Sequence, residues 1–213
     1  AEMLGLLLAA RTELEMGEYV DVRNHLDRSL DLSRRMSAGN FEAQSLMQLG
    51  RLSAAQGEMA EAQQWANEAV SVARNVGLTF IGPSALAQQA AFTEDAAERR
   101  EILKEGEDIL ESGCVAHNLF WHSFTAMDLA LTAHDWDDVE RYAKRLEMFT
   151  HAQPLAWSDF MIARGRALSA WGQGSREKGV EMELKRLRDI AVAVNLKPAL
   201  IDLEGALATP RAM

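Results

Sequence analysis

Residues 46–74 read LMQLGRLSAAQGEMAEAQQWANEAVSVAR, and this stretch decides the fold. Leu49 and Gly50 lie on a first helical segment, and Gly57 separates that segment from a second one. The second segment places small residues on one helix face, at positions i, i+4 and i+7: Ala62, Ala66 and Ala69. Because Gly50 and these alanines are small, the two helices can cross closely, and Gly57 permits the positive φ of a tight turn. The stretch therefore predicts a helical hairpin.

The turn recurs along the chain at a spacing of roughly 40 residues, which is typical of a helical solenoid. The recurring turns centre on Gly17, Gly57, Glu94, His134 and Gly174. Helices are predicted at residues 2–16 and 19–36, 41–56 and 59–76, 83–92 and 95–112, 117–133 and 136–150, and 156–171 and 176–194. The predicted fold is an all-α, right-handed α-solenoid of about five antiparallel helix pairs, in units 2–36, 41–76, 80–112, 117–150 and 156–194. A C-terminal capping helix at 198–207 completes a single domain over residues 1–213.

The repeat class follows from the small-residue pattern. A tetratricopeptide unit has about 34 residues, whereas HEAT and armadillo units have about 40–47. The Leu49-Gly50 pair and the alanine spacing favour the tetratricopeptide class, and longer linkers such as residues 75–83 account for the extra length.

Charge and composition argue against several classes of partner. The formal net charge is −10, from 22 basic and 32 acidic residues, and no cluster of Lys and Arg is large enough for a nucleic-acid surface. No apolar run reaches the length of a membrane span, and residues 3–10 are interpreted as part of a core helix. The single cysteine, Cys114, cannot form an intrachain disulfide, which suits a cytoplasmic protein. We expect neither nucleic acid nor a membrane as a partner.

Catalytic and metal-binding motifs are absent from the sequence. It contains no Gly-rich phosphate loop and no H-E-x-x-H motif. Cys114, His117 and His122 are close in sequence, but the two histidines face different sides of a helix and a fourth metal ligand is missing. We therefore predict no catalytic residue, no metal site and no cofactor, and a chain that acts by binding a protein or a peptide.

The first helix of each pair lines the concave side of such a solenoid, and this side is the predicted binding groove. In phase with Gly50, the predicted groove residues are Gln44, Met47, Arg51, Gln88, Trp121, Phe124 and Asp128. In the fifth unit the phase is ambiguous, so that either Arg164 or Arg166 faces the groove. We expect Trp121 and Phe124 to form the hot spot, with the arginines holding an acidic or C-terminal carboxylate group. The competing interpretation is that the aromatic residues fill the core and the charged residues are solvated.

Six short segments together resemble one known family. They are FEAQ (41–44), ERR (98–100), GCVAHN (113–118), DWDDVERYA (135–143), PLAWSDF (154–160) and ARGRAL (163–168). In this combination, residues 41–207 resemble the C-terminal tetratricopeptide region of bacterial class III adenylate/guanylate cyclase-related signalling proteins. In that family a cyclase domain and an ATPase domain of the AAA/STAND type precede the repeats. The resemblance implies a non-enzymatic module that regulates those upstream domains or recruits partners for them.

Two other functions fit the same sequence. One is a self-contained adaptor that binds a partner peptide, and the other is the effector-sensing arm of a STAND-type transcription regulator. The upstream coding sequence separates the three. A cyclase with an ATPase indicates the signalling protein, a stop codon indicates the adaptor, and a helix-turn-helix indicates the regulator.

Overall fold

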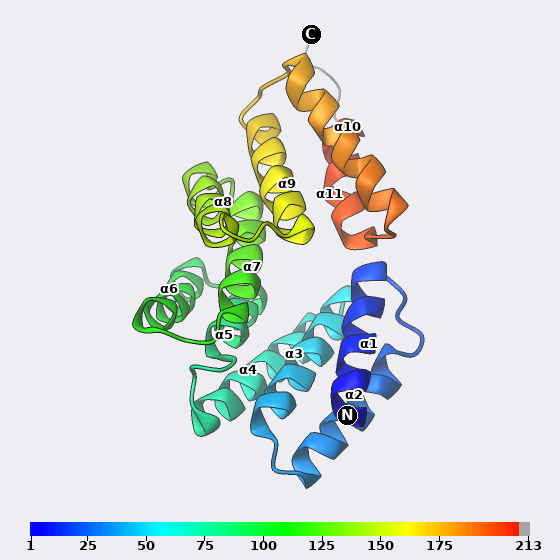
Figure 1. Ribbon diagram of the computed structural model, residues 1–213, viewed down its shortest axis with the longest axis vertical. Coiled ribbons are helices and arrows are strands. Elements are labelled where there is room, and N and C mark those ends of the chain that lie inside the picture. Colours follow the sequence, from blue (N-terminus) through cyan, green and yellow to red (C-terminus); the bar gives the residue numbers. More distant parts are fainter. Residues whose placement is uncertain (209–213) are drawn as a thin grey trace. The chain divides into compact units, whose positions relative to one another are not determined.

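The chain is all-helical in a computed structural model that describes residues 1–208 (Figure 1). The helices of this range are α1 (Glu2–Met16), α2 (Val22–Arg35), α3 (Gly39–Ala55), α4 (Met59–Val76), α5 (Gly82–Phe92), α6 (Ala96–Ser112), α7 (His117–Ala133), α8 (Trp136–Thr150), α9 (Ala156–Gly172), α10 (Lys178–Ala193) and α11 (Lys197–Ala208). No β-strand occurs among the described residues, so the predicted all-α class is confirmed for them. Four helices, α1, α4, α7 and α8, have the bounds that the sequence predicts.

Helix α2 shows the clearest departure from the predicted bounds. It begins at Val22 and not at residue 19, because residues 18–19 are irregular and a turn occupies residues 20–21. Gly17 ends α1 with a φ of 64° and a ψ of 34°, in the left-handed region. The delayed start places Val22 in the core, where it is fully buried.

A repeated backbone motif ends several of the helices. At Gly57, whose φ is +83°, the N–H donates to the carbonyl of Ala54 at 3.0 Å, and the next N–H, that of Glu58, donates to Ser53 at 2.8 Å. This pair of bonds is the Schellman motif, which satisfies the last carbonyls of a helix. The same pair of hydrogen bonds occurs at five more residues with a positive φ: Gly17, Ser37, His134, Gly174 and Asn195. Four of the predicted turns, at 17, 57, 134 and 174, therefore share one backbone geometry.

The remaining predicted turn, at residue 94, has a different cause. Thr93 is extended, with a φ of −83° and a ψ of 126°. The carboxylate of Asp95 then accepts hydrogen bonds from the N–H groups of Ala97 and Glu98, at 2.9 and 2.8 Å. A side-chain N-cap of this kind stabilises the start of α6 without a left-handed residue.

Two compact units divide the chain. The N-terminal unit is Ala1–His122 and the C-terminal unit is Ser123–Met213, so that α7 begins in one and ends in the other. In the N-terminal unit each helix from α1 to α6 packs on the next, and α3 also contacts both α1 and α5. In the C-terminal unit α8 packs on α9, α9 packs on α10, and α11 packs on both α9 and α10. The single domain that the sequence suggests stays a prediction.

Small residues mark the place where α3 and α4 cross. Ala62, Ala66 and Ala69 are fully buried. A Cβ atom at position 50 would lie 3.2 Å from the carbonyl oxygen of Ala62 and 3.1 Å from Nε2 of Gln88. The absence of a side chain at Gly50 therefore permits the close approach of these groups, as the sequence predicts.

Replacing Ala62 by Phe should lower the free energy of unfolding by about 1–3 kcal/mol, because the larger ring overpacks this crossing. Ala60→Phe is the matched control, since Ala60 lies on the exposed side of the same helix. Urea unfolding followed by circular dichroism measures both variants. Equal stability of the two variants would show that the α3–α4 register is wrong.

Candidate functional site

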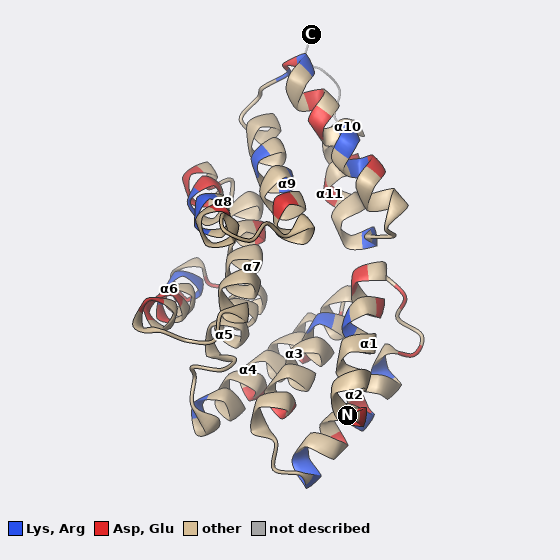
Figure 2. Ribbon diagram, viewed as in Figure 1, with Lys and Arg blue, Asp and Glu red and all other residues tan. Residues whose placement is uncertain are grey.

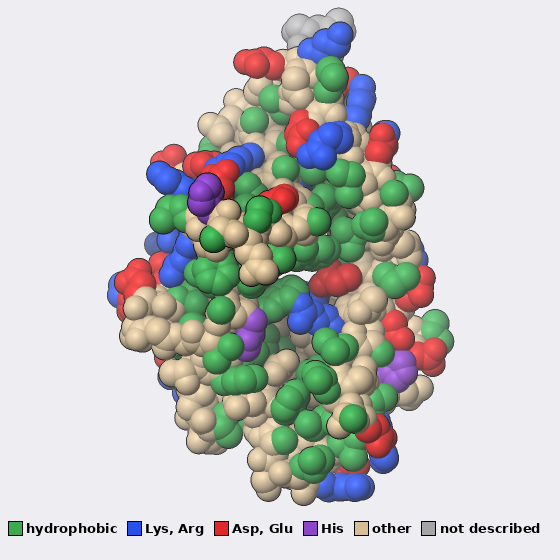
Figure 3. All heavy atoms as spheres, viewed as in Figure 1, with side chains coloured by type: hydrophobic (Ala, Val, Ile, Leu, Met, Phe, Trp, Pro, Cys, Tyr) green, Lys and Arg blue, Asp and Glu red, His purple; other side chains and the backbone are tan. Residues whose placement is uncertain are grey.

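The candidate site is the face of the N-terminal unit formed by α1, α3, α5 and the first turn of α7. Helix α3 contacts both α1 and α5, which places the first helices of consecutive predicted units beside one another. These helices carry few charges, since α5 has none and the only basic residues of α1 and α3 are Arg11 and Arg51 (Figure 2). Hydrophobic side chains are exposed over α1 and α3 in the space-filling view (Figure 3). On α1, Leu4 and Leu8 are exposed. We call this surface the first-helix face.

Gln44 and Met47 on α3 and Gln88 on α5 are three of the predicted groove residues. Gln88 is buried and donates a hydrogen bond from its side-chain amide to the backbone carbonyl of Met47. This hydrogen bond links α5 to α3. Gln44 is half-buried, and its amide lies 3.4 Å from the carbonyl of Asn40 on its own helix.

Arg51 is held at the edge of the face by two partners. Its guanidinium donates to Glu15 on α1 at 2.6 Å and to Oε1 of Gln48 at 3.1 Å. Glu15 keeps about a fifth of its side chain exposed and Arg51 about a third, so the pair is accessible from one side. These bonds fix the direction of the guanidinium before any ligand arrives.

Arg11 is a functional candidate that the sequence interpretation missed. Its guanidinium carbon lies 3.4 Å from the centre of the Trp121 ring, a cation–π contact. Burial, and to a smaller extent the nearby charge of Arg51, lower the pKa of Arg11 to about 10, although the charge of Glu15 raises it in part. Arg11 makes no hydrogen bond to any residue that the structure describes.

The regular spacing of the predicted turns also indicates Arg11. Arg11, Arg51 and Gln88 each lie six residues before a predicted turn residue, namely Gly17, Gly57 and Glu94. Equivalent positions of stacked repeats lie on the same side of an array. The same offset that selected Arg51 and Gln88 therefore also selects Arg11.

Asn118 places the start of α7 on the N-terminal unit. Its side-chain oxygen accepts from the hydroxyl of Ser84 at 2.8 Å, and its amide donates to the carbonyl of Phe80 at 2.8 Å. Asn118 is fully buried, so these bonds form away from water. They hold Trp121, one turn further along α7, in reach of Arg11.

His117 lies at the edge of the same face. Its ring meets that of Phe80 edge-on, with the ring centres 5.3 Å apart. Burial lowers the pKa of His117, a backbone hydrogen bond with Phe80 raises it in part, and the charge of Arg11 lowers it. The net shift is downward, so the imidazole is mostly neutral at pH 7.

The predicted residues of the C-terminal unit make different contacts. Phe124 is 4% exposed and packs edge-on against Trp157, with ring centres 6.3 Å apart. Arg164 is also 4% exposed, and its guanidinium forms ion pairs with Asp128 on α7, at 2.6 Å, and with Asp202 on α11. Burial lowers the pKa of Arg164, but the two carboxylates raise it by more. This triad joins α7, α9 and α11.

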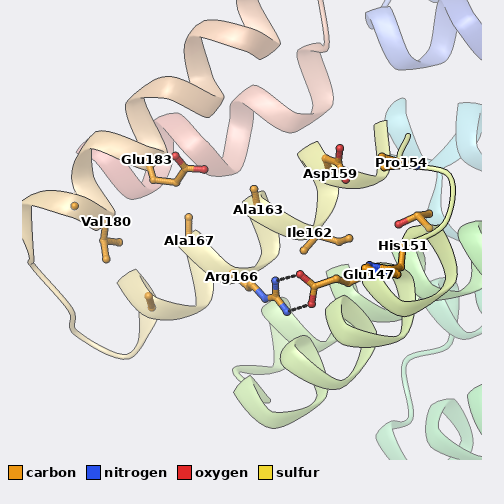
Figure 4. Close-up of a pocket in the computed structure, with 13 residues that line it drawn as sticks. Glu147, His151, Pro154, Asp159, Ile162, Ala163, Arg166, Ala167, Val180 and Glu183 are labelled. Carbon is orange, nitrogen blue, oxygen red and sulfur yellow. Dashed lines mark hydrogen bonds and ion pairs between the residues drawn. The ribbon is translucent and has the colours of Figure 1, made fainter. Parts of the chain in front are cut away.

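Arg166 lies in a hollow of about 620 Å³ between α8, α9 and α10 (Figure 4). Its guanidinium forms bidentate hydrogen bonds with both Glu140 and Glu147, at 2.8–3.1 Å. Two more carboxylates, those of Asp159 and Glu183, line the hollow. A ligand carboxylate would have to displace these glutamates, so the hollow is a poor place for an anion.

The predicted groove residues thus fall into three settings. Gln44, Arg51 and Trp121 are partly exposed on the first-helix face, whereas Met47 and Gln88 are buried beneath it. The others lie in the C-terminal unit, where Phe124 is buried against Trp157, Asp128 and Arg164 form an ion pair, and Arg166 is paired with glutamates. The buried side chains can shape a groove but must become exposed before they touch a partner, and their binding role stays a prediction.

Further searches bear on metal ions, membranes and known proteins. Among residues 1–208, no three or more His, Cys, Asp or Glu side chains are placed to hold a metal ion. In the same range, each helix is too short or too polar to cross a membrane. A scan against models of protein families and a search of curated proteins both found no match.

Proposed function

We propose that this chain is a non-enzymatic protein-interaction module that binds an extended segment of a partner on the first-helix face. The observation that carries this proposal is the grouping of Arg11, Arg51 and Trp121 in the N-terminal unit, where Arg11 lies over the Trp121 ring and Arg51 is held by Glu15 on the helix of Arg11. Aromatic and arginine side chains supply most of the binding energy in protein interfaces, because they combine a large contact area with directional hydrogen bonds. The half-buried setting of all three side chains limits the entropy that they lose on binding.

The proposed architecture is a right-handed, tetratricopeptide-like α-solenoid of five antiparallel helix pairs, with α11 as the capping helix. The recurring Schellman turns and the contacts of α3 with α1 and α5 support it. A stack of similar units requires regular spacing of the backbone turns along the chain, because each unit must present the same faces to its neighbours.

The proposed setting is a bacterial signalling protein related to adenylate cyclases, in which the module binds a partner protein or the cyclase and ATPase domains upstream of it. The resemblance of residues 41–207 motivates this setting, and the single cysteine favours the cytoplasm. Because Arg11 and Arg51 outnumber the one carboxylate beside them, Glu15, the face favours a segment that carries an acidic group.

Panning of a random peptide library on the purified chain tests the proposal. The library should display peptides with both free and amidated C-termini, so that terminal and side-chain carboxylates are distinguished. We expect enrichment of one peptide family with an acidic group beside a large apolar residue. Enrichment no greater than on an unrelated helical protein would contradict the proposed function.

A further inference from the structure

We propose that Arg11 is an oxyanion-binding group that holds the carboxylate or phosphoryl group of a bound segment above Trp121, and that His117 couples this binding to pH. The inference rests on the proposed function, because it names the chemical group that the first-helix face would recognise. Neither Arg11 nor His117 belongs to the predicted groove set, and both enter through the structure.

The first argument is the free donor capacity of Arg11. A guanidinium has five N–H donors in one plane, and a ring stacked on its face leaves those in-plane donors available. The Trp121 ring lies 3.4 Å below the guanidinium carbon of Arg11, and no described residue accepts from it. By contrast, Arg164 and Arg166 each bind two carboxylates.

A second argument comes from the charges beside Arg11. Arg51 is near enough to disfavour the charged form of Arg11, and Glu15 is already the hydrogen-bond partner of Arg51. Two cations therefore share one carboxylate in a partly desolvated place. An incoming oxyanion would relieve this repulsion and would accept paired hydrogen bonds from Arg11.

The third argument concerns His117, which lies four residues before Trp121 and therefore on the same face of α7 as the ring that Arg11 contacts. The groups that act on it are Phe80, through its ring and a backbone hydrogen bond, and Arg11, which disfavours protonation of the imidazole. An oxyanion on Arg11 would offset that repulsion and raise the pKa of His117. Because the bound state then takes up a proton more readily, binding must tighten as the pH falls.

The test uses small oxyanions, so that it does not depend on a peptide. Acetate represents a carboxylate and sulfate represents a phosphoryl group, and neither titrates between pH 6 and 8. Each is added to ¹⁵N-labelled protein at constant ionic strength maintained with chloride. The NMR signals of the arginine Nε–H groups and the tryptophan indole N–H groups report where the anion binds.

We expect saturable shifts at Arg11 and Trp121, with acetate favoured if the site recognises carboxylates and sulfate favoured if it recognises phosphoryl groups. Arg11→Gln should weaken the response of Trp121 about tenfold, the loss expected for one charge-assisted interaction. Arg35→Gln removes the same charge from an exposed position on α2 and should leave the response unchanged. Wild-type binding should tighten from pH 8 to pH 6, and His117→Gln should remove that dependence.

Unresponsive Arg11 signals in the wild-type protein would overturn the inference even if a variant misfolds. Equal responses of Arg11→Gln and Arg35→Gln, or pH dependence that persists in His117→Gln, would also overturn it. The two proposals fail separately. Peptide binding to the first-helix face without any anion response would contradict only the proposed oxyanion site. Anion binding without peptide binding would contradict only the proposed function.

Discussion

Replacing both Asp128 and Asp202 by Asn should lower the free energy of unfolding by about 3 kcal/mol. Arg164 is buried, and these two aspartates are its ion-pair partners on α7 and α11. Their neutralisation leaves a buried cation without a counter-charge, which costs about 3–5 kcal/mol in a fully buried setting. We expect the lower end of that range, because the side chains of Asp128 and Asp202 are 47% and 51% exposed.

Adding Arg164→Met to the double variant should restore most of the lost stability. A methionine of similar length packs in the same space and removes the unpaired charge. Asp189→Asn provides the matched control, because Asp189 pairs with Arg188 on the surface, where such bridges contribute less than about 1 kcal/mol. Urea unfolding of all four proteins measures the differences. If Arg164→Met makes the double variant less stable, the energetic role assigned to the triad is wrong.

The helices and turns could be predicted because their causes are local. Gly17, Gly57 and Gly174 take the left-handed conformation that ends a helix, and small residues such as Ala62 mark a helix crossing. The late start of α2 could not be predicted from local sequence in the same way. It depends on the path of residues 18–21, an irregular stretch followed by a turn, and no residue type there requires that path.

The candidate site was only partly predictable, for a related reason. The phase of Gly50 predicts Arg51 and Gln88 as groove residues; in the structure Arg51 pairs with Glu15 on α1, whereas Gln88 is buried and bonded to Met47. The spacing of six residues before a turn would also have indicated Arg11. Which of Arg164 and Arg166 is buried depends on distant partners. Arg164 is paired with residues 36 and 38 positions away, and no local sequence pattern reveals such pairs.

Trp121→Ala should weaken peptide binding about 30-fold, or about 2 kcal/mol, while the chain stays folded. The guanidinium carbon of Arg11 lies 3.4 Å from the centre of the Trp121 ring. Loss of this ring therefore removes a large contact surface and also the cation–π contact that orders the guanidinium. The peptide enriched by panning, carrying a fluorophore, gives the affinity by anisotropy. Circular dichroism checks the fold of the variant.

Trp65→Ala is the matched control for this substitution. Trp65 is a half-buried tryptophan on α4 in the same unit, and it also carries an arginine, Arg23, 5.9 Å from its ring centre. We expect its binding affinity to match that of the wild type. Unfolding of Trp121→Ala at the same temperature would mean that Trp121 is a core residue, and equal losses in both variants would exclude Trp121 as a hot spot.

The most direct test of the central claim locates the bound peptide on the unaltered protein. Methionine methyl groups labelled with ¹³C report contacts in NMR spectra, and Met47 lies on α3 beneath the first-helix face. Met59 on α4, and Met148 and Met182 in the C-terminal unit, are exposed and serve as reporters of other surfaces. The account predicts that saturating peptide shifts the Met47 signal and leaves those of Met59, Met148 and Met182 in place. A shift at any of these three with Met47 unchanged would contradict it.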